Sequence, residues 1–143
     1  THCISSAASD VYKRQEKERP YASAPSGGPL VQHSLPMMLE LSAQGVSPVE
    51  TVVEKMCHAP ARLFGVRDRG FLRTGHFADI VLVRPADPWT VSKENILYKC
   101  GWSPLEGTAF SHRVVRTLVN GRTVYADGRV DTAHRGAELE FDR

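Results

Sequence analysis

Hydrophobic positions in the first half of the chain recur every three to four residues, which is the spacing of α-helices. The first predicted helix begins at about Leu30 or His33 and ends at Ala43. One face of it holds residues three and four positions apart: Leu35, Met38, Leu39 and Ser42. Because Met37 and Leu41 lie off that face, we expect this helix to be buried on more than one side.

A second helix start follows directly. Ser47 is the predicted N-cap, Pro48 the first helical residue, and Glu50 the residue that closes a capping box. The apolar stripe behind it has the spacing i, i+3, i+4 and i+7: Val49, Val52, Val53 and Met56. We expect Pro60 to interrupt this helix and residues 61–65 to form a short final turn that ends on glycine.

The second half of the chain has the pattern of β-strands. Residues 80–83 are a continuous apolar run, which predicts a strand covered on both faces. Residues 114–119 and 123–126 flank an Asn-Gly dipeptide at 120–121. Asn-Gly favours a hairpin because a type I′ turn needs two positive φ angles. Residues 130–143 are predicted to form a polar tail.

The connection between these strands, residues 84–112, is long and rich in Pro and Gly, with a short helix expected near 92–97. So long an irregular stretch is uncommon in a compact domain. With a single hairpin in the chain, strand 80–83 has too few partners to cover it. We therefore expect an incomplete fold.

Residues 1–15 show neither helical nor strand periodicity, and the chain does not begin with Met. Residues 5–15 resemble a translated sequencing-adaptor segment, and a natural disordered tail is the alternative. On either interpretation His2 and Cys3 carry no function. Residues 16–30 are predicted to be a loop, because their prolines and glycines oppose regular structure.

Composition narrows the class of protein. The 143 residues have the length of one domain, and 41% hydrophobic with 24% charged residues is ordinary globular composition. A net charge of +2 is too small to indicate a nucleic-acid partner. No apolar run approaches the ~18 residues that a membrane span needs. Three cysteines without a C-x-x-C pair predict reduced thiols in the cytoplasm.

Most residues with potential chemistry have a structural interpretation. We expect His33 to be a hydrogen-bonded helix residue, and His58 to meet the dipole at the end of the second helix. Cys57 is expected to face the core, and Cys100 and Trp102 to pack within a loop. No two of the six histidines stand two residues apart, so an H-x-H metal motif is absent.

Two segments carry a family resemblance. Residues 75–83 (GHFADIVLV) and 119–125 (VNGRTVY) resemble the C-terminal end of amidohydrolase-superfamily enzymes. In that superfamily the last part of a TIM barrel gives way to strands that complete a small β-sandwich begun by the N-terminus. The resemblance implies an α/β fold, with the last helices of the barrel followed by the strands of the sandwich.

Three further segments narrow the resemblance to the cyclic-amidase branch and, within it, to dihydroorotases. Residues 16–33, which include APSGGPLVQH, are similar to the loop after the last barrel strand. Residues 58–65 (HAPARLFG) resemble the closing barrel helix, and 95–107 (NILYKCGWSPLEG) resemble a loop of the sandwich. The H-x-H and D-H-A-P-H motifs of the family are missing, and no catalytic role is transferred to Asp10.

The resemblance implies that residues 16–66 belong to a metal-dependent hydrolase barrel and residues 67–143 to a composite β-sandwich. It implies zinc, a small-molecule substrate (dihydroorotate or N-carbamoyl-aspartate) and a homo-oligomer at full length, in pyrimidine biosynthesis. Backbone groups just after the Ala-Pro of the family hold the substrate, which points to Pro25, Ser26 and Gly27. We expect no catalytic and no metal-binding residue in this chain, and no turnover by the chain alone.

Two alternatives stay open at this stage. Allantoinases and hydantoinases share a similar Trp-Ser-Pro-x-Glu-Gly segment, here residues 102–107, so a fragment of either is a competing interpretation. The other is a non-catalytic, dihydropyrimidinase-like interaction domain. For the candidate substrate loop itself, the alternative is an ordinary Pro/Gly connector.

Overall fold

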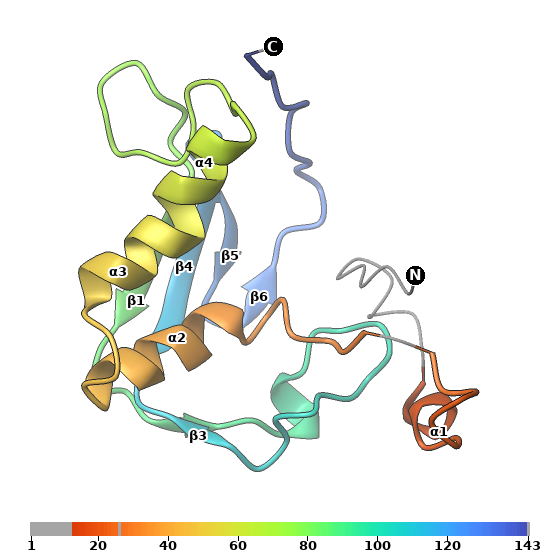
Figure 1. Cartoon of the computed structure of the whole chain (residues 1–143). Coiled ribbons are helices and arrows are strands. Elements are labelled where there is room, and N and C mark those ends of the chain that lie inside the picture. The colour runs from red at the N-terminus through yellow and green to blue at the C-terminus, as the bar shows by residue number, and fades with distance from the viewer. Residues whose placement is uncertain (1–12, 26, 143) are drawn as a thin grey trace.

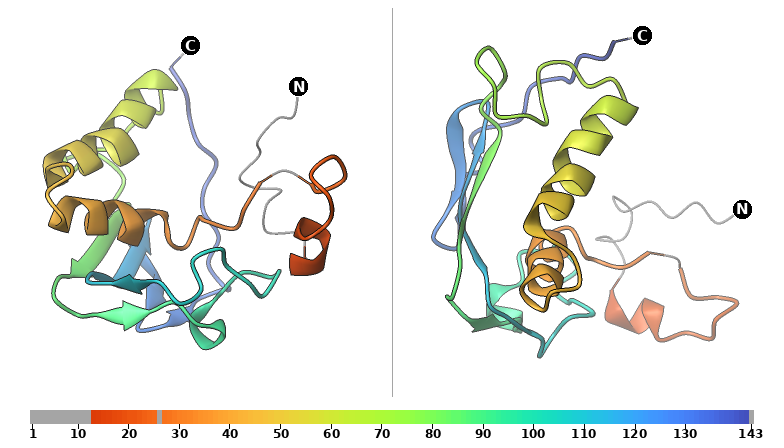
Figure 2. Two further views of the ribbon diagram at one scale, coloured as in Figure 1. Left: turned by 60° about the horizontal axis from the view of Figure 1, so that its bottom comes forward. Right: turned by 60° about the vertical axis from the view of Figure 1, so that its left-hand side comes forward.

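The fold has two layers, a layer of helices and an antiparallel sheet, as the computed structural model shows for residues 13–25 and 27–142. Helices α2 (Ser34–Ala43), α3 (Val49–Val53) and α4 (Ala59–Leu63) lie on one side of the sheet, which is clearest in the right-hand view of Figure 2. The sheet has the strand order β1-β4-β5-β6. Its strands are β1 (Ile80–Arg84), β4 (Arg113–Val119), β5 (Arg122–Ala126) and β6 (Arg129–Val130).

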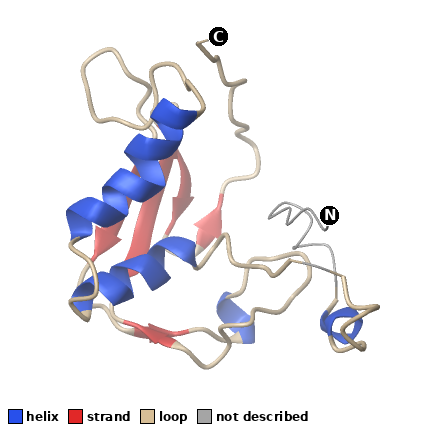
Figure 3. Cartoon of the chain, in the orientation of Figure 1, coloured by secondary structure: helices blue, strands red, loops and turns tan. Residues whose placement is uncertain are grey.

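Helix α2 confirms the first predicted helix. The second forms as well, but two details of its prediction are wrong. The N-cap is Pro48 rather than Ser47, with extended geometry (ψ 150°). No side chain caps the helix, because the proline ring has no hydrogen-bonding atom. The expected interruption at Pro60 does not occur, because residues 49–63 are helical without a break and Pro60 lies in α4. Figure 3 draws this stretch as one helical ribbon.

A π-helical segment, η2 (Glu54–His58), lets the helix continue through Pro60. The Ala59 N–H donates to the Glu54 carbonyl, which shifts the hydrogen bonding by one residue. Pro60 then lies in the first turn of α4, where its missing N–H is tolerated. The helix ends before Gly65, which has a φ of +60°.

Strand β1 forms where predicted, and the described residues leave it partly uncovered, as its lack of partners led us to expect. β1 is an edge strand that pairs with β4 alone. Val81 and Leu82 are each 45% exposed, although adjacent strand residues point to opposite faces of a sheet. Apolar side chains on this edge strand therefore remain in contact with solvent.

The predicted hairpin is confirmed. Asn120 and Gly121 have φ angles of +51° and +77° and join β4 to β5. A second turn of the same kind, at Asp127 and Gly128 (φ +47° and +83°), joins β5 to β6. Strand β6 was missed because Val130 was assigned to the polar tail and Arg129 to no element, although Asp-Gly is also a hairpin signal.

The long connection is more ordered than predicted. Strands β2 (Trp89–Thr90) and β3 (Ala109–Phe110) pair as a separate two-stranded ribbon. Between them the expected short helix is a 3₁₀ turn, η3 (Lys93–Asn95). Phe110 and Val91 are almost fully buried here, next to helix α2. The connection therefore contributes part of the core.

Both ends of the described chain depart from the predicted loops. Residues Arg14–Lys17 form a short helix, α1, inside the stretch expected to be irregular. At the other end, Phe141 forms an isolated antiparallel bridge with Val66, and Arg67 pairs with Glu140 and Asp142. Residues 1–12, with His2, Cys3 and Asp10, lie outside the described residues.

The core is small, and its side chains come from the three helices and from the ribbon region. The buried apolar side chains are Leu39, Val52, Ala61, Val91 and Phe110. Three polar or charged side chains are buried with them: His33, Arg69 and Ser103. Among the described residues, no helix is long and apolar enough to cross a membrane.

Candidate functional site

The candidate substrate loop is held in place by Lys17. The Lys17 ammonium donates to the carbonyl of Pro25 at 2.7 Å and also to the carbonyl of Gly27. Gly27 has a φ of +91°, which glycine adopts without strain, whereas Gly28 has open space around the position of a Cβ. Ser26 lies outside the described residues. The substrate-binding role of Pro25, Ser26 and Gly27 stays a prediction.

Directly after this loop, Gln32 binds a segment that is more than 60 residues away in sequence. Its side-chain amide donates to the Asn95 carbonyl at 2.7 Å and accepts the Leu97 N–H at 2.9 Å. Its backbone N–H donates to the Tyr98 hydroxyl at 2.8 Å. This arrangement joins the start of α2 to the loop after η3, and it was missed in the sequence because no local pattern marks such a pairing.

His33 lies beside Gln32 and is completely buried. Its Nδ1 is 3.2 Å from the Ser103 hydroxyl and 3.4 Å from the Tyr98 hydroxyl. Burial lowers the pKa of the imidazole, because a charged ring is poorly solvated there. The prediction of a hydrogen-bonded histidine at the helix start is confirmed.

A third contact anchors α2 two turns further along. Glu40 accepts both the backbone N–H of Ser111 at 2.8 Å and its hydroxyl at 2.7 Å. The Ser111 hydroxyl is also 2.9 Å from Nδ1 of His112. Hydrogen bonds hold the pKa of Glu40 below its ordinary value, and those donated by Ser111 have the largest effect.

The predicted amidohydrolase-like motifs are joined by a buried arginine. Arg69 pairs with Asp79 and donates to the side-chain oxygen of Asn120 at 2.8 Å, and its guanidinium lies 4.1 Å from the centre of the Phe77 ring. Asp79 in turn accepts the Asn120 N–H at 2.8 Å. The Ala-Asp of residues 78–79 and the Asn-Gly turn are therefore held together in space.

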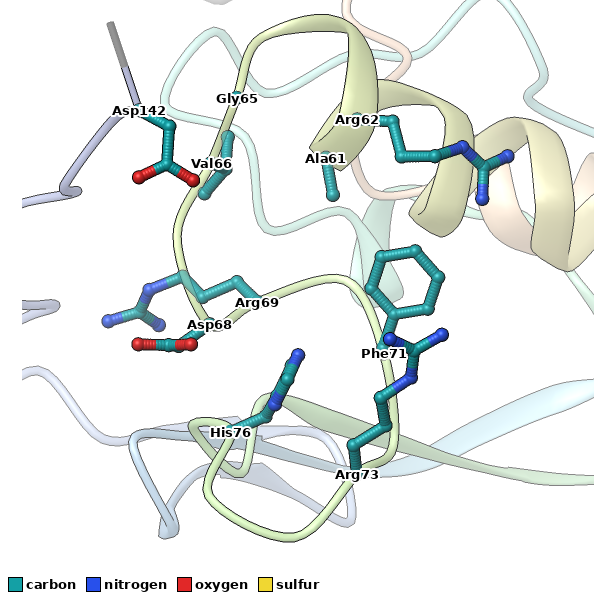
Figure 4. Close-up of a pocket in the computed structure, with 10 residues that line it drawn as sticks. All are labelled: Ala61, Arg62, Gly65, Val66, Asp68, Arg69, Phe71, Arg73, His76 and Asp142. Carbon is teal, nitrogen blue, oxygen red and sulfur yellow. The ribbon is translucent and has the colours of Figure 1, made fainter.

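A pocket of about 380 Å³ opens beside this cluster. Figure 4 shows that its side chains come from the end of α4, from the loop that follows, and from the C-terminal tail at Asp142. Phe71 is central to one wall: His58 stacks on it at 4.5 Å and Arg73 lies 4.4 Å from its ring centre. These contacts tie the loop to the helix.

Two residues of the second helix are placed differently from expectation. His58 does not meet a helix end, because the helix continues to Leu63; it pairs with Glu54 at 3.2 Å and stacks on Phe71. Cys57 is exposed rather than facing the core. The helix continues past His58 because the π-helical segment accommodates Pro60, and Cys57 lines the open space between the helix and the sheet.

A larger, mainly apolar cavity of about 780 Å³ lies between the helix layer and the sheet. Its apolar walls come from α2, α3, β1 and the loop before β1, and include these side chains: Leu39, Val49, Val53, Leu72, Ile80 and Val81. His58 and His112 also contribute to its lining. The cavity has the size and the apolar character of a ligand pocket.

Zinc is implied by the family resemblance. A zinc site needs three or four His, Cys, Asp or Glu side chains converging on one point. Within residues 13–25 and 27–142, no group of three or more such side chains is placed to hold a metal ion. The described residues do not fit a zinc centre.

Comparison with known proteins places the chain among hydrolases. The model of the Amidohydrolase family matches residues 34–125. A dihydroorotase of Halobacterium salinarum is 34% identical over 128 residues, which cover 90% of this chain and 30% of that protein. An allantoinase of Bacillus velezensis is 40% identical over 103 residues, covering 72% of this chain and 22% of that protein.

Comparison of the fold with solved structures gives relatives of the same kind. The solved structure of L-hydantoinase (dihydropyrimidinase) from Arthrobacter aurescens matches with a TM-score of 0.70 and 30% identity, over 78% of this chain and 25% of that one. The chain thus spans about a quarter of the length of the curated relatives it matches.

Proposed function

We propose, on the premise that this chain belongs to the amidohydrolase family, that it is the C-terminal part of a hydrolase of cyclic amides, specifically a zinc-dependent dihydroorotase. The observation that carries the proposal is the 34% identity to a dihydroorotase across 90% of the chain. The reaction would be the reversible hydrolysis of dihydroorotate to N-carbamoyl-aspartate, in pyrimidine biosynthesis.

Within such an enzyme, residues 16–66 would form the end of the barrel and residues 67–143 part of the β-sandwich. The order of the elements supports this division, because the helices precede the antiparallel sheet. The substrate would meet the backbone of Pro25, Ser26 and Gly27. Lys17 supports that role, since it binds two carbonyls of the loop and fixes its shape.

The metal would be held by residues other than those described, whose donor set does not fit zinc. We accordingly expect the 143-residue chain alone to be inactive. The test is a dihydroorotate hydrolysis assay with added zinc, in which turnover above background would contradict the expectation. A cytoplasmic location and a homo-oligomeric whole enzyme complete the proposal.

A second candidate function is that of an allantoinase or hydantoinase. It is favoured by the 40% identity to an allantoinase, although over a shorter part of the chain. The sharpest test grafts this chain into both relatives. In one chimera it replaces the matching segment of the Halobacterium salinarum dihydroorotase, and in the other that of the Bacillus velezensis allantoinase.

We expect the dihydroorotase chimera to hydrolyse dihydroorotate and the allantoinase chimera to lose allantoin hydrolysis. The reverse result would assign the chain to the allantoinase branch and overturn the first proposal. Both chimeras are checked for cooperative unfolding, so that loss of activity is read only from folded protein.

The substrate loop has its own test within the active chimera. Gly27→Ala places a side chain at a φ of +91°, which costs about 1–2 kcal/mol and is expected to raise KM by roughly 5- to 30-fold. Gly28→Ala is the matched control, because nothing lies within 4 Å of its Cβ position. Equal KM values for the two variants would show that the loop is a connector, whichever substrate the enzyme takes.

A further inference from the structure

His33 lies in an aromatic enclosure between helix α2 and the ribbon. Its ring centre is 5.9 Å from that of Trp89, 5.6 Å from that of Tyr98 and 6.4 Å from that of Phe110. The side chain is completely buried, and its Nε2 has no hydrogen-bond partner among the described residues. Such a site accepts a neutral imidazole far more readily than a charged one.

The hydrogen bonds on the other nitrogen favour one tautomer. The Ser103 hydroxyl oxygen accepts the Leu105 N–H at 3.2 Å, and its own proton can be donated to Nδ1 of His33, 3.2 Å away. With that bond, Nδ1 is the acceptor of a neutral ring and Nε2 carries the ring proton. A second proton on the imidazole would go to Nδ1, and the Ser103 hydroxyl would have to turn its proton away.

The charged groups near the enclosure contact other residues and not the imidazole of His33 itself. Glu106 accepts the Ser103 N–H, Glu40 and His112 bind Ser111, and Arg113 lies 5.8 Å from the Trp89 ring centre. Tyr98 is the ionisable side chain that contacts the imidazole itself. Burial is accordingly the cause that lowers the pKa of His33, with no contribution from a neighbouring charge.

The same enclosure fastens a distant segment to the candidate substrate loop. Ser103 and Tyr98 contact His33, while Gln32 binds the backbone of Asn95 and Leu97. We propose that His33 is a proton-sensitive latch: neutral, it holds residues 95–103 against the start of α2; protonated, it releases them. The proposal stands on these contacts and does not depend on which substrate the enzyme takes.

The sign of the pH dependence follows from linkage. When the segment is released, His33 is solvated and titrates near its ordinary pKa of about 6.5; when it is held, the pKa is lower. The held state is therefore fully favoured above pH 6.5 and weakens as the pH falls towards the lowered pKa. In that window the equilibrium for release rises about tenfold per pH unit, because one proton is taken up.

Hydrogen exchange of the full 143-residue chain measures this equilibrium. The reporters are the amides of Gln32 and Leu97, whose hydrogen bonds break on release. After correction for intrinsic exchange, we expect their protection to fall about tenfold per pH unit below pH 6.5. In His33→Asn, which keeps an acceptor near the Nδ1 position but does not titrate, protection should be independent of pH.

His134→Asn is the matched control, because His134 is an exposed histidine of the tail, and it should behave as the wild type. Trp89 emission, measured in a Trp102→Phe background that retains His33, gives a second readout should His33→Asn not fold. It should change with a midpoint below pH 6.5. Protection that is flat with pH in the wild type, a Trp89 midpoint at or above pH 6.5, or an unchanged slope in His33→Asn would overturn the proposal.

Discussion

Helix α2 and the helix that follows it are attached to the strands in opposite ways. Polar contacts at Gln32, His33 and Glu40 fasten α2 to the connection between β1 and β4. The α3–α4 helix instead faces β1 across an apolar cavity of about 780 Å³. We call the first region the polar junction (residues 32–40 with 89–111) and the second the apolar cavity.

The two regions differ in what fixes the position of a helix and in what stabilises it. Directional hydrogen bonds fix where the polar junction lies, and its buried Phe110 and Val91 supply hydrophobic free energy beside them. The side chains around the apolar cavity are apolar too, but Val49, Val53 and Val81 stay 41–47% exposed and therefore bury less area. We expect the polar junction to dominate the cooperative unfolding of this chain.

Truncation of one apolar side chain in each region should show the largest difference between the two regions. Phe110→Ala removes a ring that is 3% exposed and packed on Trp89, and should lower the free energy of unfolding by about 3–5 kcal/mol. Val81→Ala on β1, where the side chain lines the apolar cavity and is 45% exposed, should cost less than about 1 kcal/mol. Urea unfolding measures both, and equal losses would show that the two regions contribute alike.

A smaller effect tests how closely the loop beside the cavity is packed. Gly70 has a φ of +79°, and a Cβ there would lie 2.5 Å from the Cβ of Ala61. Gly70→Ala should therefore cost about 2–4 kcal/mol, from backbone strain and overpacking together. Gly75→Ala is the control, with a similar φ of +88° and open space, and should cost the strain alone. Matching losses in thermal unfolding would mean that the contact with Ala61 contributes nothing.

Elements with a local cause could be predicted from the sequence. Periodicity predicted α2, the apolar run predicted β1, and Asn-Gly predicted the hairpin between β4 and β5. The π-helical turn was not predictable in this way, because its hydrogen-bond shift has no simple sequence pattern.

The candidate site likewise has one part that local sequence predicts and another that depends on tertiary contacts. The Pro-Ser-Gly segment marked a loop through its own residues, whereas the pairing of Gln32 with Asn95 and of His33 with Ser103 arises from tertiary contacts. Such pairs join residues more than 60 positions apart, and hydrophobic patterning carries no information on them. The zinc expectation rested on family resemblance alone and has no counterpart in the described residues.

The smallest expected effect is on the stability of the chain at acidic pH. Hydrogen bonds from Ser111 hold the pKa of Glu40 below its ordinary value, so the folded state favours the carboxylate. The stabilisation is present above the ordinary pKa of about 4.5 and is lost as the pH falls through the lowered value.

Glu40→Gln keeps an acceptor for Ser111 but removes this titration. Unfolding midpoints measured between pH 6 and pH 3 should therefore fall less steeply in Glu40→Gln than in the wild type, while Glu50→Gln, on the exposed first turn of α3, should follow the wild type. Parallel curves for all three proteins would show that α2 is held to the strands without help from this carboxylate, and the polar junction would then rest on Gln32, His33 and apolar burial.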